Sequence, residues 1–263
     1  MEQAKKIKIS IIGGGNLAFQ LARVFTSNGM MPSQILVRNK AFWDDFEPFC
    51  NEVILKTQQL EACDLLFLAV NDDAVSELAK QVKLTNTLIV HTSGSLNANA
   101  AACPENKYGV FYPLQTFSKV RFPDFNEIPI FIQAEDEKSF ELLKIVAGKI
   151  SKNVQLANDP MRKTLHVAAV FVSNFSHALF AMADEYLKEQ SVPFAHLHPL
   201  IKETVNKAIE TDLYHGQTGP ARRNDIKTIE SHLKMLEQHP EKAEIYKMLT
   251  SYIYQKYHRD KHE

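Results

Sequence analysis

Short apolar runs alternate with amphipathic segments along the first 157 residues of the chain. Apolar runs bounded by turn residues are typical of strands, and an apolar stripe that recurs every three to four residues is typical of a helix. Strands are predicted at 7–12, 34–38, 52–55, 64–70, 87–93, 108–112, 128–133 and 153–157. Helices are predicted at 16–28, 41–49, 73–82 and 137–150. Because strands and helices alternate, we expect an α/β fold with a mostly parallel, doubly wound sheet.

The pattern changes near residue 158, and only helical periodicity follows. Helices are predicted at 160–189, 194–212, 221–238 and 241–258. We therefore expect two domains, a sheet domain at 1–157 and an all-helical domain at 158–263. The apolar stripes of the helical domain are larger than one sheet domain can cover, which predicts a homodimer with two-fold symmetry.

A glycine-rich turn joins the first predicted strand to the first predicted helix. It reads Gly13-Gly14-Gly15-Asn16-Leu17-Ala18, a G-x-G-x-x-A pattern. The first glycine permits the tight turn, the second lets the backbone approach a pyrophosphate, and the small third residue lets helix and strand pack closely. The pyrophosphate then lies at a helix N-terminus, where free N–H groups favour negative charge. This context predicts a dinucleotide-binding, Rossmann-like domain; a loop without a ligand and a methyl-donor site are the alternatives.

The end of the second predicted strand indicates which dinucleotide binds. NAD-binding proteins usually carry Asp or Glu there to bind the ribose 2′-hydroxyl, whereas this chain has Arg38, Asn39 and Lys40. Two cations attract a 2′-phosphate. The sequence therefore predicts NADP as the cofactor, and a pair of solvated surface cations is the alternative.

Two further strand ends meet the same edge of the predicted sheet. The fourth strand ends at Val70 and Asn71, and the fifth is followed by Thr92, Ser93 and Gly94. Ligands of open α/β sheets bind outside the carboxyl ends of the strands, so these residues are predicted to flank the ribose and nicotinamide. Ordinary turn chemistry is the alternative, since such residues favour turns.

The stretches GGGNLA, VRNK, LAVNDDAV and HTSG, in this order, resemble the pyrroline-5-carboxylate reductase and 6-phosphogluconate dehydrogenase superfamily. Within it, a branch of candidate NADP oxidoreductases is more similar, and some of its members are labelled deazaflavin-coenzyme-dependent. This branch pairs a Rossmann-like domain with a helical C-terminal domain of unknown function. Two further stretches resemble it, YPLQTFS at 112–118 and TGPARRND at 218–225. The resemblance implies an NADP cofactor and gives no established reaction.

The long predicted helix carries a polar line beside its apolar stripe. At 100° per residue, His166, Ser173 and His177 lie within about 40° of one another, and Asn174 lies beside them. The ordinary pKa of a histidine side chain is near neutral, so a histidine can donate a proton to a substrate. We predict His166, Ser173 and Asn174 as catalytic residues and His177 as a substrate contact. Histidines buried in a core or a subunit interface are the alternative.

The segment TGPARRND is predicted to be a loop that starts a helix. Arg222 and Arg223 are candidates to clamp a substrate carboxylate or the cofactor phosphates, and Asp225 to orient one of them. The alternative is helix-start chemistry with a solvated charge cluster.

Composition limits the partners. The chain has 263 residues and a formal net charge of −1, which favours neither nucleic acid nor an anionic membrane. Three cysteines without a C-x-x-C pair predict reduced thiols in a cytoplasmic protein. No apolar run reaches the roughly 18 residues of a membrane span, and no zinc-type motif is present. We therefore expect no nucleic acid, membrane or metal partner.

These observations predict an NADP-dependent oxidoreductase. NADPH would deliver hydride to the C=N or C=O carbon of a small substrate held in an interdomain cleft, and the protein would supply a proton. A protein that senses NADP(H) without turnover is the alternative, because a fold does not fix a function.

Overall fold

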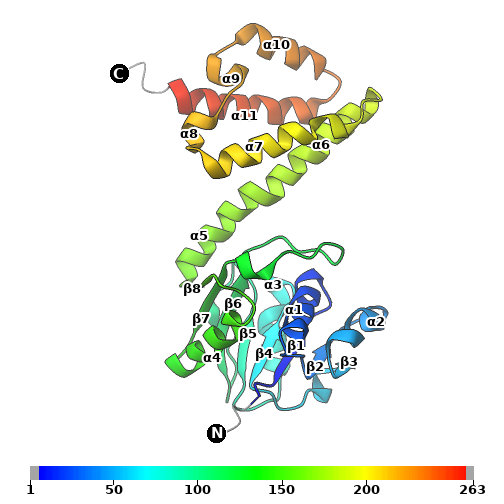
Figure 1. The fold of residues 1–263 in the computed structure, drawn as a ribbon, viewed down its shortest axis with the longest axis vertical. Coiled ribbons are helices and arrows are strands. Elements are labelled where there is room, and N and C mark those ends of the chain that lie inside the picture. Colours follow the sequence, from blue (N-terminus) through cyan, green and yellow to red (C-terminus); the bar gives the residue numbers. More distant parts are fainter. Residues whose placement is uncertain (1–5, 259–263) are drawn as a thin grey trace. The chain divides into compact units, whose positions relative to one another are not determined.

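The computed structural model describes residues 6–258 and divides into two compact units, Met1–Asn174 and Phe175–Glu263. Figure 1 shows a sheet with its covering helices in the first unit and helices alone in the second. The predicted α/β fold with a helical C-terminal part is confirmed.

The first unit is built on one eight-stranded sheet with the order β3-β2-β1-β4-β5-β6-β7-β8. Neighbouring strands are parallel from β3 to β6, β7 is antiparallel to β6, and β8 is parallel to β7. All eight predicted strands are present. They are β1 (Ile9–Ile12), β2 (Gln34–Leu36), β3 (Glu52–Ile54), β4 (Leu65–Leu68), β5 (Leu88–His91), β6 (Lys107–Pro113), β7 (Ile130–Ala134) and β8 (Val154–Leu156).

Helices cover both faces of this sheet. On one face, α1 (Asn16–Ser27) and α4 (Glu137–Gly148) bury their apolar side chains against the strands. On the other, α3 (Asp72–Gln81) and the 3₁₀ turn η4 (Ala98–Ala101) do the same. Because both faces are covered, the central strands β1, β4 and β5 are fully buried and mostly apolar, with Ser10 and His91 as their polar residues.

The predicted helix at 41–49 is broken. Two 3₁₀ turns, η1 (Lys40–Phe42) and η2 (Glu47–Phe49), flank one α-helical turn, α2 (Trp43–Phe46). Pro48 lies within η2 and has no backbone N–H, which works against a continuous α-helix. Two more 3₁₀ turns, η3 (Thr57–Gln59) and η5 (Phe125–Glu127), connect strands.

The predicted helix at 160–189 is helical throughout but not uniformly α-helical. It consists of α5 (Asp159–Ala169), a π-helical segment η6 (Val170–Phe175) and α6 (Ser176–Glu189). A π-helix bonds residue i to residue i+5 and takes more residues per turn than an α-helix. The angle of 100° per residue therefore does not hold across this segment. The prediction that Ser173 and His177 lie on the same helix face as His166, which assumed that angle, was wrong.

The two units meet at a different residue from the predicted boundary between 157 and 158. The last strand, β8, ends at Leu156 and α5 begins at Asp159, so the change from strand to helix lies at the predicted position. The compact units, however, divide after Asn174. The first half of the long helix belongs to the sheet unit because its buried Arg162 donates to Gln133 of β7 and to the Leu96 carbonyl.

The second unit contains only helices. After α6 they are η7 (Phe194–Leu197), α7 (His198–Glu210), α8 (Leu213–Gly216), α9 (Pro220–Arg223), α10 (Ile226–Met235) and α11 (Pro240–His258). Asp212 and Asp225 cap α8 and α10 by accepting from the backbone N–H groups of His215 and Thr228. Within the described part of this unit, Ala221 is the one buried residue. Its apolar side chains are therefore widely exposed, among them Leu200, Ile209, Leu213, Met248 and Tyr252.

One helical stretch, Asp159–Glu189, is long and apolar enough to cross a membrane by length and composition. The search for continuous apolar runs in the sequence predicts no such stretch. A single such stretch is weak evidence, because a helix covered by another protein surface has the same composition.

Candidate functional site

The glycine turn follows β1 and leads directly into α1. Gly13 has φ +148°, and a Cβ atom there would lie 2.2 Å from the Ala69 carbonyl oxygen and 3.3 Å from Cβ of Ala18. The protein's own packing therefore requires glycine at 13 and a small residue at 18. A Cβ atom on Gly15 would meet nothing within 4 Å, and its backbone lies in the extended region open to any residue. Nothing within the described protein explains Gly15, whereas an approaching phosphate does.

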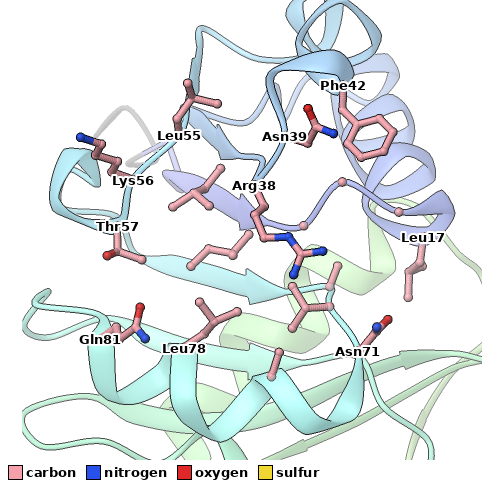
Figure 2. A pocket seen from close by; sticks show the side chains of 18 of the residues that line it. Leu17, Arg38, Asn39, Phe42, Leu55, Lys56, Thr57, Asn71, Leu78 and Gln81 are labelled. Carbon is pink, nitrogen blue, oxygen red and sulfur yellow. The ribbon is translucent and has the colours of Figure 1, made fainter.

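A cavity of about 1330 Å³ opens at this turn. It is formed by residues at or just beyond the carboxyl ends of β1 to β5 and by Ala74, Leu78 and Gln81 of α3 (Figure 2). The predicted cofactor residues that line it are Gly13, Gly15, Asn16, Leu17, Arg38, Asn39, Lys40, Val70, Asn71 and Thr92. Ala18, Ser93 and Gly94 are not among its lining residues: Ala18 is buried beneath the turn, and the other two follow Thr92.

The charged residues of the lining are all cations, namely Arg38, Lys40 and Lys56. Figure 2 shows the Arg38 guanidinium extending into the cavity, with Lys56 at the rim. Such a lining favours an anionic ligand. Lys56 was missed in the sequence, although the carboxyl end of the third strand carries it; applying the strand-end rule to that strand as well would have found it.

Two asparagines of the lining also have structural partners. The Asn39 side chain accepts from the Ala41 N–H at 2.9 Å and so caps η1, which is the turn chemistry kept as an alternative for such residues. The Asn16 side chain donates to the Phe117 carbonyl at 3.1 Å. One turn along α1, Gln20 donates to the Ser118 carbonyl at 2.5 Å and to the Arg121 carbonyl at 3.0 Å. The YPLQTFS segment is thereby fixed beside the glycine turn.

The loop after β5 is shaped by a buried histidine. Nδ1 of His91 accepts from the Ser93 N–H at 3.2 Å, which leaves the proton on Nε2 to donate to the Asn97 carbonyl at 3.0 Å. Burial lowers the pKa of His91 to about 4, so the ring is neutral at physiological pH. The Ser93 hydroxyl accepts from the Ser95 and Leu96 N–H groups. Ser93 therefore acts as a turn residue.

His166 lies against this loop. Its Nδ1 atom is 3.0 Å from the hydroxyl oxygen of Tyr112 at the end of β6, and the two rings meet edge to face. Both side chains lie over Gly94, where a Cβ atom would come within 2.6 Å of the imidazole and 2.8 Å of the phenol ring. The predicted catalytic histidine and the predicted nicotinamide loop are thus brought together. Tyr112 was missed as a site residue because only the tertiary fold places it there.

The other predicted residues of the long helix are not gathered at this point. Ser173 is half-buried and Asn174 exposed, both in the π-helical segment, and His177 is exposed in α6. Their proposed contacts with a substrate stay predictions.

The two arginines of the TGPARRND segment differ. Arg222 donates to the His215 and Gln217 carbonyls and lies over the Tyr257 ring, so its guanidinium holds the preceding loop. Arg223 is exposed. Asp225 caps α10 through Thr228. For Arg222 and Asp225, the structure thus gives the helix-start role that was the alternative to substrate binding.

The buried cysteines and the search for metal ligands add no residue to this site. Burial raises the pKa of Cys50 and of Cys63 to about 11, which suits core thiols. Within residues 6–258, no group of three or more metal-ligating side chains is found.

The glycine turn, the cationic cavity and the parallel strand order are those of a Rossmann-type NAD(P)-binding protein. Comparison with known proteins agrees. The family model described as "NADP oxidoreductase coenzyme F420-dependent" matches residues 8–94, and a "Domain of unknown function (DUF2520)" matches residues 128–253. No curated protein matches the chain.

Solved structures give the closer parallels. A protein from Bacteroides fragilis, named as a candidate NADP oxidoreductase, is 36% identical, with a TM-score of 0.89 over 95% of this chain and 98% of that one. Protein TM1727 from Thermotoga maritima is 19% identical, with a TM-score of 0.71 over 96% and 99% of the two chains. A reductive aminase from Aspergillus terreus, solved with NADPH and ethyl levulinate, is 16% identical, with a TM-score of 0.68 over 97% and 95%. The chain belongs to the family of NADP oxidoreductase-like proteins that carry the DUF2520 domain, and the predicted resemblance is confirmed.

The open space at Gly15 leads to a test of the cofactor site. We expect Gly15→Val to fold with an unchanged melting temperature, because the apo protein has room for the side chain, and to lose NADP⁺ binding in titration calorimetry. Gly148→Val is the matched control, since a Cβ atom there also meets nothing within 4 Å, and it should bind normally. Full affinity in Gly15→Val would place the ligand elsewhere.

Proposed function

We propose that this protein is an NADP-dependent oxidoreductase that transfers hydride between NADP(H) and the C=N or C=O group of a small substrate. The observation that carries the proposal is the pairing of a cation-lined cavity at the glycine turn with a histidine beside Gly94, two residues beyond the cavity wall at Thr92. Further support comes from the NADP oxidoreductase family match and from a reductive aminase with NADPH among the structural neighbours.

Each part of the site has a distinct task in this proposal. The bound cofactor supplies the hydride. The turn at Gly13–Ala18 and the α1 N-terminus hold its pyrophosphate, and Arg38 and Lys40 hold the 2′-phosphate. Asn71 and the 92–94 backbone position the ribose and nicotinamide. His166 gives a proton to the substrate oxygen or nitrogen.

The choice between NADP and NAD depends on Arg38. We expect NADPH to bind at least about tenfold more tightly than NADH, roughly 1.4 kcal/mol. Arg38→Asp should remove or reverse this preference, because a carboxylate repels the 2′-phosphate and accepts from a 2′-hydroxyl.

Lys80→Asp is the control for that substitution. It makes the same charge change on the exposed surface of α3, and Lys80 does not line the cavity. Fluorescence titrations of both cofactors against all three proteins give the answer. Equal affinities for NADPH and NADH in the unmodified protein would overturn the assignment.

The reaction itself is tested through His166. NADPH oxidation is followed against a panel of imines, 2-oxo acids and aldehydes. With a substrate in hand, His166→Ala should lower kcat by about 10²–10⁴ while NADPH affinity stays within threefold. His196→Ala, an exposed histidine of the helical unit, should turn over normally.

Melting temperatures, measured in the same experiment, distinguish a catalytic role of His166 from a structural one. A His166→Ala protein that melts early yet turns over at the normal rate would assign His166 to the scaffold. Tight NADPH binding with no turnover across the panel would favour the sensor instead.

We also propose that a second copy of this chain covers the exposed helices of the C-terminal unit. The unit has one buried residue among those described, and exposed apolar side chains occur on α7, α8, α10 and α11. Isolated helices are marginal without packed apolar faces, and a two-fold dimer buries the same patch on both copies.

Sedimentation equilibrium at micromolar concentration should give a mass of about 60 kDa, twice the 29.9 kDa of the chain. Ile209→Glu, at a side chain that is 78% exposed on α7, should shift the mass toward the monomer because it buries a charge in the interface. Lys80→Glu, at an exposed position on α3 of the sheet unit, is the control. A mass near 30 kDa for the unmodified protein would contradict the dimer.

A further inference from the structure

The hydrogen bond between Tyr112 and His166 involves an almost fully buried phenol. Tyr112 is 8% exposed, lies next to the last residue of β6, and its hydroxyl meets Nδ1 of His166 at 3.0 Å. The other ring nitrogen, Nε2, is the one left for a substrate. A residue that holds one nitrogen of a histidine decides which nitrogen carries the proton.

Gly94 shows that the loop makes room for this pair. The positive-φ glycines among residues 6–258 are Gly13, Gly29 and Gly219, so Gly94 is not required by its backbone conformation. It is required by space, because a Cβ atom would overlap both the imidazole and the phenol ring. The loop predicted to face the nicotinamide is therefore shaped around Tyr112 and His166.

A buried guanidinium lies close to this pair. The buried guanidinium of Arg162 lies one helical turn before His166 and donates to Gln133 and Asp159. Burial raises the pKa of Tyr112, and the positive charge of Arg162 opposes that rise. The other titratable groups at this edge are Asp72, which accepts from Ser95, the neutral His91, and Lys163, which donates to Asn97.

In the tautomer in which the Tyr112 O–H donates to Nδ1, the imidazole carries its proton on Nε2. A neutral imidazole that gives up this proton becomes an imidazolate unless Nδ1 gains one at the same time. The Tyr112 hydroxyl is the group placed to supply it.

We propose that Tyr112 is a positioning residue that makes neutral His166 a proton donor, an inference that rests on the proposed function. When hydride adds to the substrate carbon, the π electron pair of the C=N or C=O group moves to the nitrogen or oxygen. That atom takes the proton from Nε2 of His166, and the Tyr112 hydroxyl proton moves to Nδ1. Nδ1 then returns its proton to the phenolate, which lies near the positive charge of Arg162, and Nε2 takes a proton from water, so that the starting tautomer is restored before the next turnover. The net change consumes NADPH and one proton per C=N or C=O group reduced.

This relay has a characteristic pH dependence. In the unmodified protein the donor is the neutral pair, so kcat holds through neutral pH until the tyrosine ionises. Without the hydroxyl, the donor has to be the imidazolium, whose fraction falls as the pH rises. A hydroxyl that only supports packing would lower kcat equally at every pH.

The test compares Tyr112→Phe with the unmodified protein, using NADPH with the cyclic imine 1-pyrroline and with ethyl levulinate. Between pH 6 and 8.5, kcat of the unmodified protein should change less than threefold and that of Tyr112→Phe should fall by more than about tenfold, with NADPH affinity unchanged. Tyr108→Phe, half-buried and four residues earlier on β6, should follow the unmodified profile. Parallel profiles for Tyr112→Phe and the unmodified protein would overturn the proposal.

A second measurement needs no turnover. In ¹⁵N NMR of histidine-labelled protein, His166 should be in the Nε2–H form at pH 7.5 and become a mixture of tautomers in Tyr112→Phe. Gly94→Ala should give the same mixture by pushing the rings apart, whereas Gly148→Ala should not. If the unmodified protein reduces neither 1-pyrroline nor ethyl levulinate, the result counts against the proposed function. An Nδ1–H ring in the unmodified protein would still overturn the role of Tyr112.

Discussion

The cofactor edge of this protein depends on one close approach between backbones. Gly13 directly follows β1 and donates its N–H to the Leu36 carbonyl at 2.9 Å, and the Ala69 N–H donates to the Ile12 carbonyl at 2.9 Å. The ends of β2, β1 and β4 are therefore tied at a single point, where the Ala69 carbonyl occupies the place of a side chain on residue 13. This approach fixes where α1 begins, and the free N–H groups at its N-terminus face the cavity.

Three glycines at this edge have three different physical reasons. Gly13 is required by a positive φ and by the Ala69 backbone, and Gly94 by the rings of Tyr112 and His166. Gly15 has neither constraint, and a ligand is what accounts for it. The comparison separates residues that build the site from residues that leave space for what binds there.

Buried polar contacts join the helical stretch to the sheet. Arg162 is fully buried and reaches β7 and the loop after β5 from the first turn of α5. A buried guanidinium is costly unless its N–H groups have partners, so this contact fixes α5 on the sheet unit. His166 follows one turn later, and its place beside Gly94 is a consequence of that fixed register. The π-helical segment after Ala169 then changes the direction of every later side chain.

The sequence by itself determined the sheet, the glycine turn and the cations after β2. Each is a local property: a strand period, a turn that tolerates few residues, and a charge at a strand end. It also indicated His166, but through an angular argument that the π-helical segment invalidates for Ser173 and His177. The tertiary structure alone decided that Tyr112 meets His166 over Gly94 and that Arg162 holds α5 against β7. These contacts join residues of different elements: Tyr112 is in β6, His166 is in α5 and Gly94 is in the loop after β5. Such elements come together only through strand order and helix packing, which no local pattern encodes.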